Sequence, residues 1–177
     1  MSLESTTLAG GCFWCLEAVF EQVKGVHKVV SGYTGGSLPD PSYELICTGL
    51  TGHAEVVNIN FDTDFVTFED LLNIFFVIHD PTTLNRQGAD VGTQYRSAIF
   101  FETLEQKETA NAIISKLENS AVWANPIVTS VEPLDEFYEA EHYHQSYFRN
   151  NPGLGYCQVV IEPKVAKLRS EFLSALK

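Results

Sequence analysis

The chain has 177 residues, of which 45% are hydrophobic and 19% charged, and its formal net charge is −12. A chain of this length suits one domain with a sizeable core, and we expect a single domain over residues 1–177. Nucleic acids and anionic membranes need a basic protein surface. The acidic balance therefore argues against both as partners.

The amino-terminal residues 1–5 show neither the basic start nor the apolar segment of a signal sequence. No stretch approaches the roughly 20 apolar residues of a membrane span. We therefore expect a cytoplasmic protein with no membrane partner. Disulfide frameworks belong to oxidising compartments, so the cysteines should be reduced thiols that serve catalysis or metal binding. There are four of them, Cys12, Cys15, Cys47 and Cys157.

The first half of the chain alternates between strand and helix patterns. Residues 5–9 predict a strand, and residues 13–23 predict a helix that ends before Gly25. Further strands are expected at 26–32 and, after a proline-containing loop, at 51–61. Thr67 with Asp70 forms a weak capping box for a helix with an apolar face over 68–79.

The second half continues the alternation after a polar, glycine-rich loop. Loops as long as this one, residues 85–94, are more often functional than idle in compact domains. Strands are expected at 95–101 and 127–131, and between them Thr103 with Gln106 caps a helix. Residues 137–148 have a helical pattern rich in polar and aromatic side chains. A closing helix buries apolar side chains from Val165 to Leu176. Strands and helices interleave throughout, which indicates a mixed α/β sandwich with helices packed on a sheet.

The stretch from Gly10 to Cys15 joins the first strand to the first helix. Cys12 therefore lies at a helix amino terminus, where free N–H groups and the helix dipole favour negative charge. We expect this position to lower the pKa of the Cys12 thiol and to activate its sulfur as a nucleophile. The plainer alternative is an inert, buried cysteine after a tight glycine turn.

Glu55 has an unusual place in the strand of residues 51–61. Alternation puts it on the same face as Val57 and Ile59, an apolar face. Burial disfavours the charged form of a carboxyl group, so its pKa should rise and it could donate a proton near neutral pH. The alternative is a side chain that swings into solvent or forms an ion pair.

Three other functions share parts of this pattern. A C-x-x-C pair at the start of a helix is typical of disulfide oxidoreductases, although this reading leaves Glu55 without a task. A cysteine hydrolase with His144 as base lacks an assignable Asn or Asp partner. A zinc site would need a second pair of ligands close together in sequence, which is absent. The residues with suitable ligand types are Cys12, Cys15, His142, His144 and Cys157.

Five short motifs follow one another along nearly the whole chain. They are GGCFW at 10–14, GYTGG at 32–36, TGHAEV at 51–56, DVGTQYRS at 90–97 and AEHYHQ at 140–145. Together they resemble the ordered motifs of the peptide methionine sulfoxide reductase A family. The resemblance implies a two-layer, ferredoxin-like α/β sandwich that reduces the S epimer of methionine sulfoxide, free or in proteins, with electrons from thioredoxin. The implied reaction requires no metal and no organic cofactor, and we expect the protein to be a monomer.

The resemblance also assigns catalytic residues. Cys12 matches the family's nucleophile and Glu55 its acid, while Tyr43, Tyr95 and Asp90 match the polar groups around the sulfoxide oxygen. A sulfoxide oxygen leaves poorly until it is protonated, so attack by a thiolate on sulfur needs a neutral carboxyl group and phenol donors nearby. The products would be methionine and a sulfenic acid on Cys12.

The substrate pocket follows from the same motifs. Phe13 and Trp14 match the apolar walls that hold the methyl group of the substrate. We count His144 with the substrate-binding residues.

Two cysteines compete to resolve the sulfenic acid, and we expect Cys157 ahead of Cys15, because Cys157 follows the break at residues 150–153, where a mobile segment could swing towards Cys12. Cys157 matches a recycling position of the family, but the usual glycine-rich tail with a further cysteine is absent. Cys15 stands where many relatives carry glycine, and it is close to Cys12 in sequence. A disulfide between them would distort a regular helix unless Cys12 lies just before the first turn. Cys47 is expected to be packed and inert.

Overall fold

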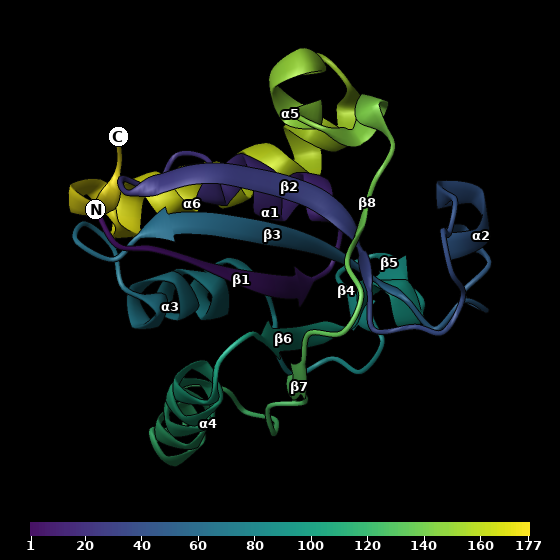
Figure 1. The fold of residues 1–177 in the computed structure, drawn as a ribbon. Helices are drawn as coiled ribbons and strands as arrows, with labels where there is room; N and C mark the ends of the chain where they lie inside the picture. Colours follow the sequence, from purple (N-terminus) through teal and green to yellow (C-terminus); the bar gives the residue numbers. More distant parts are fainter.

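The computed structural model describes residues 1–177 and contains one mixed sheet of six strands. The order across the sheet is β7-β6-β1-β3-β2-β8 (Figure 1). Neighbouring strands run antiparallel except β6 and β7, which are parallel. The bounds are β1 Leu3–Gly10, β2 Val26–Thr34, β3 Ala54–Asp62, β6 Ser97–Phe101, β7 Ser130–Pro133 and β8 Tyr138–Glu139.

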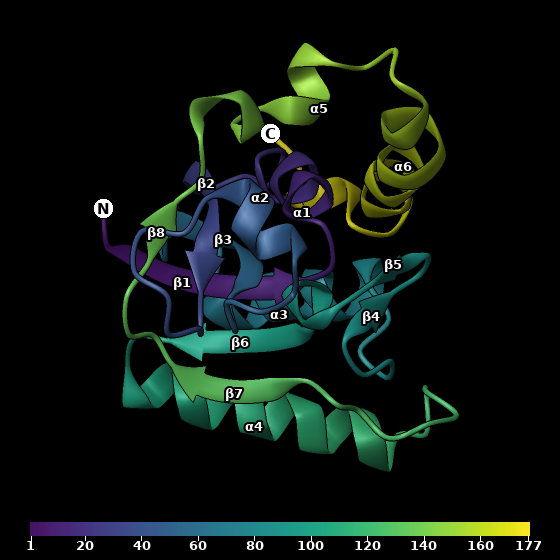
Figure 2. The ribbon, with the colours of Figure 1, turned by 90° about the vertical axis from the view of Figure 1, so that its right-hand side faces the viewer.

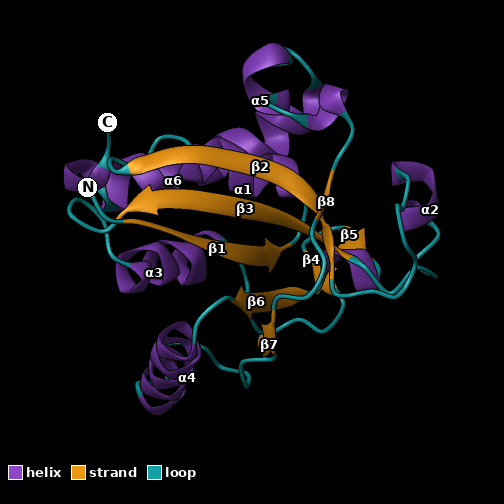
Figure 3. Cartoon of the chain, in the orientation of Figure 1, coloured by secondary structure: helices purple, strands orange, loops and turns teal.

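The longer helices pack on one face of this sheet. They are α1 (Phe13–Phe20), α3 (Phe68–Ile78), α4 (Leu104–Asn119) and α6 (Glu162–Glu171), and Figure 2 shows them around the strands. The main core joins their apolar side chains to Leu8 of β1, Ile59 of β3 and Ile99 of β6. Leu134 and Phe137 pack against a smaller cluster, made of the alternate strand residues on the opposite face. The interleaved strands and helices (Figure 3) confirm the mixed α/β class.

Several shorter elements complete the chain. Near the end of the sheet to which β1 points lie α2 (Tyr43–Cys47) and the hairpin of β4 (Arg86–Gln87) and β5 (Asp90–Val91) (Figure 1). The remaining elements are four short helical turns and one short helix: η1 Thr93–Tyr95, η2 His142–His144, α5 Tyr147–Asn150, the π-helical η3 Cys157–Ile161 and η4 Leu173–Ala175. None of the helices is both long and apolar enough to cross a membrane.

The two predicted helix caps are confirmed. The Thr67 hydroxyl accepts the Asp70 N–H at 3.1 Å, and the Asp70 carboxylate accepts the Thr67 N–H at 2.9 Å. At the start of α4 the Thr103 hydroxyl accepts the Gln106 N–H at 3.2 Å. These bonds satisfy N–H groups that have no partner inside the helix.

Several predicted bounds were too generous. The strand expected from residue 51 begins at Ala54, and the closing helix ends at Glu171. The first helix ends at Phe20, because Val23 pairs with Leu176 in an isolated bridge instead of continuing the helix. Tyr95 belongs to a 3₁₀ turn, so the following strand begins at Ser97. The β7 strand begins at Ser130, three residues later than expected.

The predicted helix over 137–148 is wrong. Tyr138 and Glu139 form β8 and pair with β2, and only two short turns follow. The Gln145 side chain bonds to the backbone of Ser31 on β2, as acceptor at 3.0 Å and donor at 2.9 Å. The left-handed backbone of Ser146, with a φ of 53°, then breaks any helix. Pairing with β2 thus overrides the local helical pattern.

Candidate active site

Cys12 lies directly before the first turn of α1, after the carboxyl end of β1. Its backbone is extended, with φ −61° and ψ 127°, and its carbonyl accepts the Cys15 N–H at 3.1 Å. Gly11 makes this approach possible with a φ of +93°, where a Cβ would come within 2.6 Å of the Gln87 side chain. The predicted placement of Cys12 at the helix start is confirmed.

Glu55 lies at the start of β3, beneath the first turn of α1. Its side chain is 1% exposed, and its carboxylate accepts the Phe13 N–H at 3.2 Å. Burial raises the pKa of Glu55 to about 8, although the Phe13 N–H opposes the shift. The group therefore holds its proton at neutral pH. The expectation from strand alternation is confirmed, and the alternative of a solvated or ion-paired side chain is wrong.

The prediction that the helix start lowers the pKa of Cys12 is wrong. Burial raises the pKa of the Cys12 thiol well above its usual value, and contact with the Cys15 thiol and the charge of Glu55 add to the rise. The Cys12 contact instead lowers the pKa of Cys15, although burial opposes that shift. Removing a thiolate from water thus outweighs the favourable field of the helix terminus.

The three polar residues predicted around the sulfoxide oxygen gather at this site. Burial and then the charge of Glu55 raise the pKa values of Tyr43 and Tyr95, so both phenols remain protonated donors. Asp90, from the β4–β5 hairpin, also acts on the pKa of Glu55, and its carboxylate accepts the Tyr156 hydroxyl at 2.7 Å. Three separate stretches thus place hydrogen-bonding groups around one carboxyl group.

An aromatic wall borders these groups. The Trp14 indole N–H donates to Nδ1 of His144 at 3.1 Å, and the Trp14 ring stacks on Tyr147 with centroids 3.7 Å apart. The Phe13 and His144 rings are 5.0 Å apart. The acceptor role of Nδ1 places the proton of neutral His144 on Nε2, which is buried without a partner. His144 therefore bonds to Trp14 and not to Cys12, which disfavours the hydrolase alternative.

Three further residues belong to the site but were not predicted. The Glu141 carboxylate accepts the Tyr33 hydroxyl at 3.1 Å and the Tyr43 N–H at 2.9 Å. The Tyr156 hydroxyl lies close enough to Cys12 to act on the pKa of its thiol, which it lowers. Tyr33 and Glu141 lie inside the matched motifs, and Tyr156 precedes Cys157, so their positions were the available signal.

The four cysteines are free and differ in their surroundings. Cys12, Cys15 and Cys157 are buried, whereas Cys47 is exposed at the end of α2. The expectation that Cys47 is packed is wrong. No three His, Cys, Asp or Glu side chains gather in a way that could hold a metal ion.

Comparisons with known proteins identify the family of this chain. The profile of the family described as peptide methionine sulfoxide reductase matches residues 4–176. A relative from Polynucleobacter asymbioticus, named peptide methionine sulfoxide reductase MsrA, is 57% identical over 99% of this chain and 92% of its own. The chain belongs to the peptide methionine sulfoxide reductase family. It is an oxidoreductase that reduces methionine sulfoxide.

Solved structures of the family share the fold. Mxr1 from Saccharomyces cerevisiae in its reduced form superimposes with a TM-score of 0.79 at 35% identity, over 88% of this chain and 90% of its own. Methionine sulfoxide reductase A of Corynebacterium diphtheriae gives 0.78 at 37% identity, over 89% and 79%. The two-layer α/β architecture expected for the family is therefore confirmed.

Proposed function

We propose that the enzyme reduces the S epimer of methionine sulfoxide, free or in proteins, with Cys12 as nucleophile and Glu55 as proton donor. The observation that carries this proposal is the buried carboxyl group of Glu55 beside Cys12, with a pKa of about 8. A group with this pKa is protonated at neutral pH and can still release its proton. Burial of Glu55 in the core therefore keeps the carboxyl group protonated for its role as proton donor.

The reductive step balances with these two groups. Glu55 gives its proton to the sulfoxide oxygen while the Cys12 sulfur attacks the sulfur of the substrate. The bond formed between the two sulfurs and the sulfur–oxygen bond of the substrate then break, the hydroxyl passes to the Cys12 sulfur, and the thiol proton of Cys12 restores the protonated carboxyl group of Glu55. The substrate sulfur gains two electrons and Cys12 loses two, which leaves methionine and a cysteine sulfenic acid.

The surrounding groups have separate tasks in this proposal. Tyr43 and Tyr95 are neutral phenols near Glu55, and they donate hydrogen bonds to the sulfoxide oxygen as charge develops on it. Asp90 accepts the Tyr156 hydroxyl and so keeps this phenol beside Cys12.

The aromatic residues form the pocket for the methyl group. Phe13 and Trp14 lie directly after Cys12, so the first turn of α1 presents both rings beside the reacting sulfur. His144 holds the Trp14 ring through the bond from the indole N–H.

The geometry supports Cys15 as the thiol that resolves the sulfenic acid. Cys12 has an extended backbone before the first turn, so a bond to Cys15 does not require a regular helix to distort. The two thiols lie close enough for each to shift the pKa of the other. Condensation of the sulfenic acid with the Cys15 thiol releases water and forms a disulfide, which thioredoxin reduces. Cys157 is the second candidate, because its thiol lies near Cys15.

We also infer that the protein works as a single-domain monomer in the cytoplasm. All four of its thiols are free, and a reducing compartment keeps them ready for this chemistry.

The reaction is tested with resolved epimers of a methionine sulfoxide peptide and dithiothreitol. We expect methionine from the S epimer and none from the R epimer. The same sample should not reduce insulin disulfides, which is the reaction expected of a C-x-x-C disulfide oxidoreductase. Reduction of insulin without sulfoxide turnover would contradict the proposal.

The resolving thiol is identified by peptide mapping after one equivalent of sulfoxide is added without reductant. We expect a Cys12–Cys15 disulfide in the native enzyme and in Cys157→Ser. In Cys15→Ser, thioredoxin-driven turnover should fall more than dithiothreitol-driven turnover, because a small thiol can attack the sulfenic acid directly. A dominant Cys12–Cys157 disulfide in the native enzyme would assign the role to Cys157.

A further inference from the structure

A second buried carboxyl group lies on α1, and the proposed reaction does not use it. Glu17 is 3% exposed and has no basic partner within ion-pair distance. Its carboxylate accepts the Ser31 hydroxyl of β2 at 3.0 Å. A buried acid without a cation is costly to keep in a protein interior. Its contacts should therefore show what it does.

Glu17 lies where α1 and β2 meet a segment from the far end of the chain. We call residues 142–150, which contain η2 and α5, the strap; Figure 1 shows α5 next to α1 and β2. The backbone N–H groups of Ser146 and Tyr147 in the strap favour the ionised form of Glu17. The Gln145 side chain meanwhile bonds to both backbone groups of Ser31. Glu17 and Ser31 together therefore hold the centre of the strap.

The strap supports one wall of the site. Its His144 accepts the Trp14 indole N–H at 3.1 Å, and its Tyr147 stacks on the Trp14 ring with an interplanar angle of 6°. Trp14 is three residues before Glu17, one turn of the same helix. The orientation of the Trp14 ring thus depends on where the strap lies, and the strap is held by Glu17.

We propose that Glu17 is a positioning residue, whose buried carboxylate anchors the strap so that His144 and Tyr147 fix Trp14 in the substrate pocket. This inference rests on the proposed role of Trp14 in binding the substrate. Glu17 does not touch the reacting sulfur, so it should act on substrate affinity and not on the chemical step.

The charge of this anchor changes near neutral pH. Burial raises the pKa of Glu17 to about 7, the Ser31 hydroxyl opposes the rise, and the charge of Glu21 adds to it. The other charged group near this junction is Arg149 of the strap, which pairs with Glu21 at 3.2 Å. Above pH 7 the carboxylate is ionised and attracts the Ser31 hydroxyl and the strap N–H groups more strongly than its protonated form does, so this anchor weakens below pH 7.

Steady-state kinetics at pH 8 test the positioning role. Glu17→Gln should raise KM for an S-methionine sulfoxide peptide roughly tenfold and leave kcat within about twofold, because hydrogen bonds to a charged group are lost away from the reacting atoms. Glu69→Gln removes an exposed carboxyl group on α3, away from the strap, and is the control that should leave KM within about twofold. A Glu17→Gln variant with native KM, or with an equal loss in kcat, would overturn the proposal.

Fluorescence tests the same anchor without turnover, so failure here is distinct from failure of the proposed function. The chain has two tryptophans, and Trp123→Phe leaves Trp14 as the only one. In that background the Trp14 emission should titrate with a midpoint near pH 7. The transition should persist in Glu55→Gln and disappear in Glu17→Gln.

Ser31→Ala provides a second variant in case Glu17→Gln folds poorly. The lost hydroxyl no longer stabilises the carboxylate, so the midpoint should move to higher pH. The proposal is wrong if the transition is unchanged by Glu17→Gln, or if Ser31→Ala leaves the midpoint where it was.

Discussion

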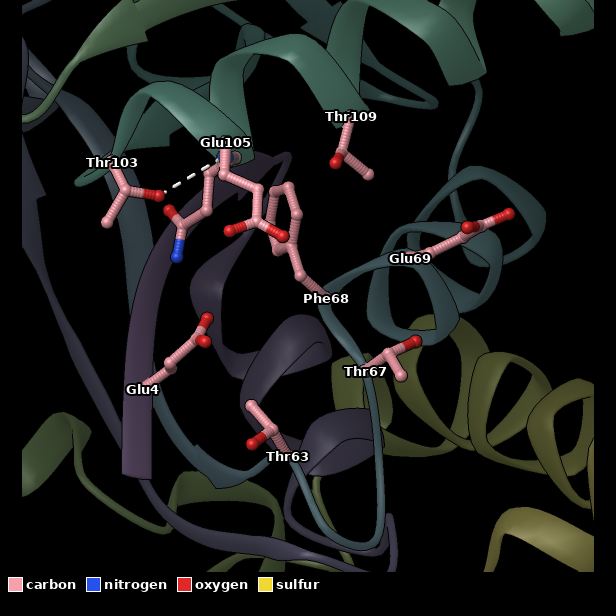
Figure 4. A pocket seen from close by; sticks show the side chains of 9 residues that line it. Glu4, Thr63, Thr67, Phe68, Glu69, Thr103, Glu105 and Thr109 are labelled. Carbon is pink, nitrogen blue, oxygen red and sulfur yellow. Dashed lines mark hydrogen bonds between the residues drawn. The ribbon is translucent and has the colours of Figure 1, made fainter. Parts of the chain in front are cut away.

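The α3–α4 side of the molecule and the segments over the active site satisfy their polar groups in different ways. On the α3–α4 side the side chains that cap the two helices bond to residues three positions away, as in Thr67 with Asp70. Between the first turns of these helices lies a polar hollow lined by threonines and glutamates, where Thr103 caps α4 (Figure 4). None of the proposed catalytic residues lines this hollow.

Over the active site the partners are far apart in sequence. Trp14 bonds to His144, 130 residues away, and Tyr33 to Glu141, 108 residues away. The same region holds the two buried carboxyl groups with raised pKa values, Glu55 and Glu17. Local bonds thus cap these two helices, whereas long-range bonds assemble reactive groups that are costly to bury. Substitutions in the two regions should therefore separate activity from stability.

The largest effect is expected for Cys12→Ser, which should abolish sulfoxide reduction because a hydroxyl cannot supply the two electrons. Its free energy of unfolding should stay within about 1 kcal/mol of the native value, as for most changes of similar volume. Methionine formation and urea unfolding measure the two quantities. Cys47→Ser makes the same change at an exposed thiol and should keep native turnover. Residual activity of Cys12→Ser near the native rate would contradict the role of Cys12.

Glu55→Gln should act on activity and stability in opposite directions. Without a transferable proton, methionine formation in a single turnover should slow by about 10²- to 10⁴-fold. The raised pKa means that folded Glu55 keeps a proton which the unfolded chain releases, so stability falls as pH rises from 4.5 to about 8. Gln removes this dependence and should stabilise the protein at pH 8 by on the order of 4 kcal/mol.

The stability arm is measured by urea unfolding of both proteins from pH 5 to pH 9. The gain should be small at pH 5, because Glu55 is protonated in the folded protein and partly so in the unfolded chain. Glu69→Gln serves as the control, because Glu69 lies on the exposed side of α3. Asn58→Asp is unsuitable, because Asn58 and Glu55 lie on opposite faces of β3. If the gain in unfolding free energy does not grow with pH, Glu55 does not have the raised pKa.

The smallest effect is expected for Thr67→Ala on the α3–α4 side. Loss of the cap should cost about 1 kcal/mol, which lowers Tm by roughly 2–4 °C for a chain of this size. The kcat and KM for the sulfoxide peptide should be unchanged. Thermal unfolding and kinetics on the same sample provide the check, with Thr67→Ser as the variant that keeps the cap. A change in KM would show that the two regions are coupled.

Features that depend on near neighbours could be predicted from the residue pattern alone. The caps at Thr67 and Thr103 follow from three-residue spacing, and the burial of Glu55 follows from strand alternation with Val57 and Ile59. Gly10 and Gly11 likewise predicted a turn that places Cys12 before a helix.

Features that depend on distant partners could not be predicted in this way, because they form only when the chain folds. Residues 137–148 carry a helical pattern, yet pairing with β2 and the Gln145 bonds to Ser31 draw them into a strand and turns. The pKa of Cys12 likewise depends on what covers it, which the helix terminus alone does not reveal. Tyr156 reaches Asp90 across 66 positions of sequence. Local propensities span a few residues, whereas desolvation and hydrogen bonding at this site depend on groups that meet only when the sheet has formed.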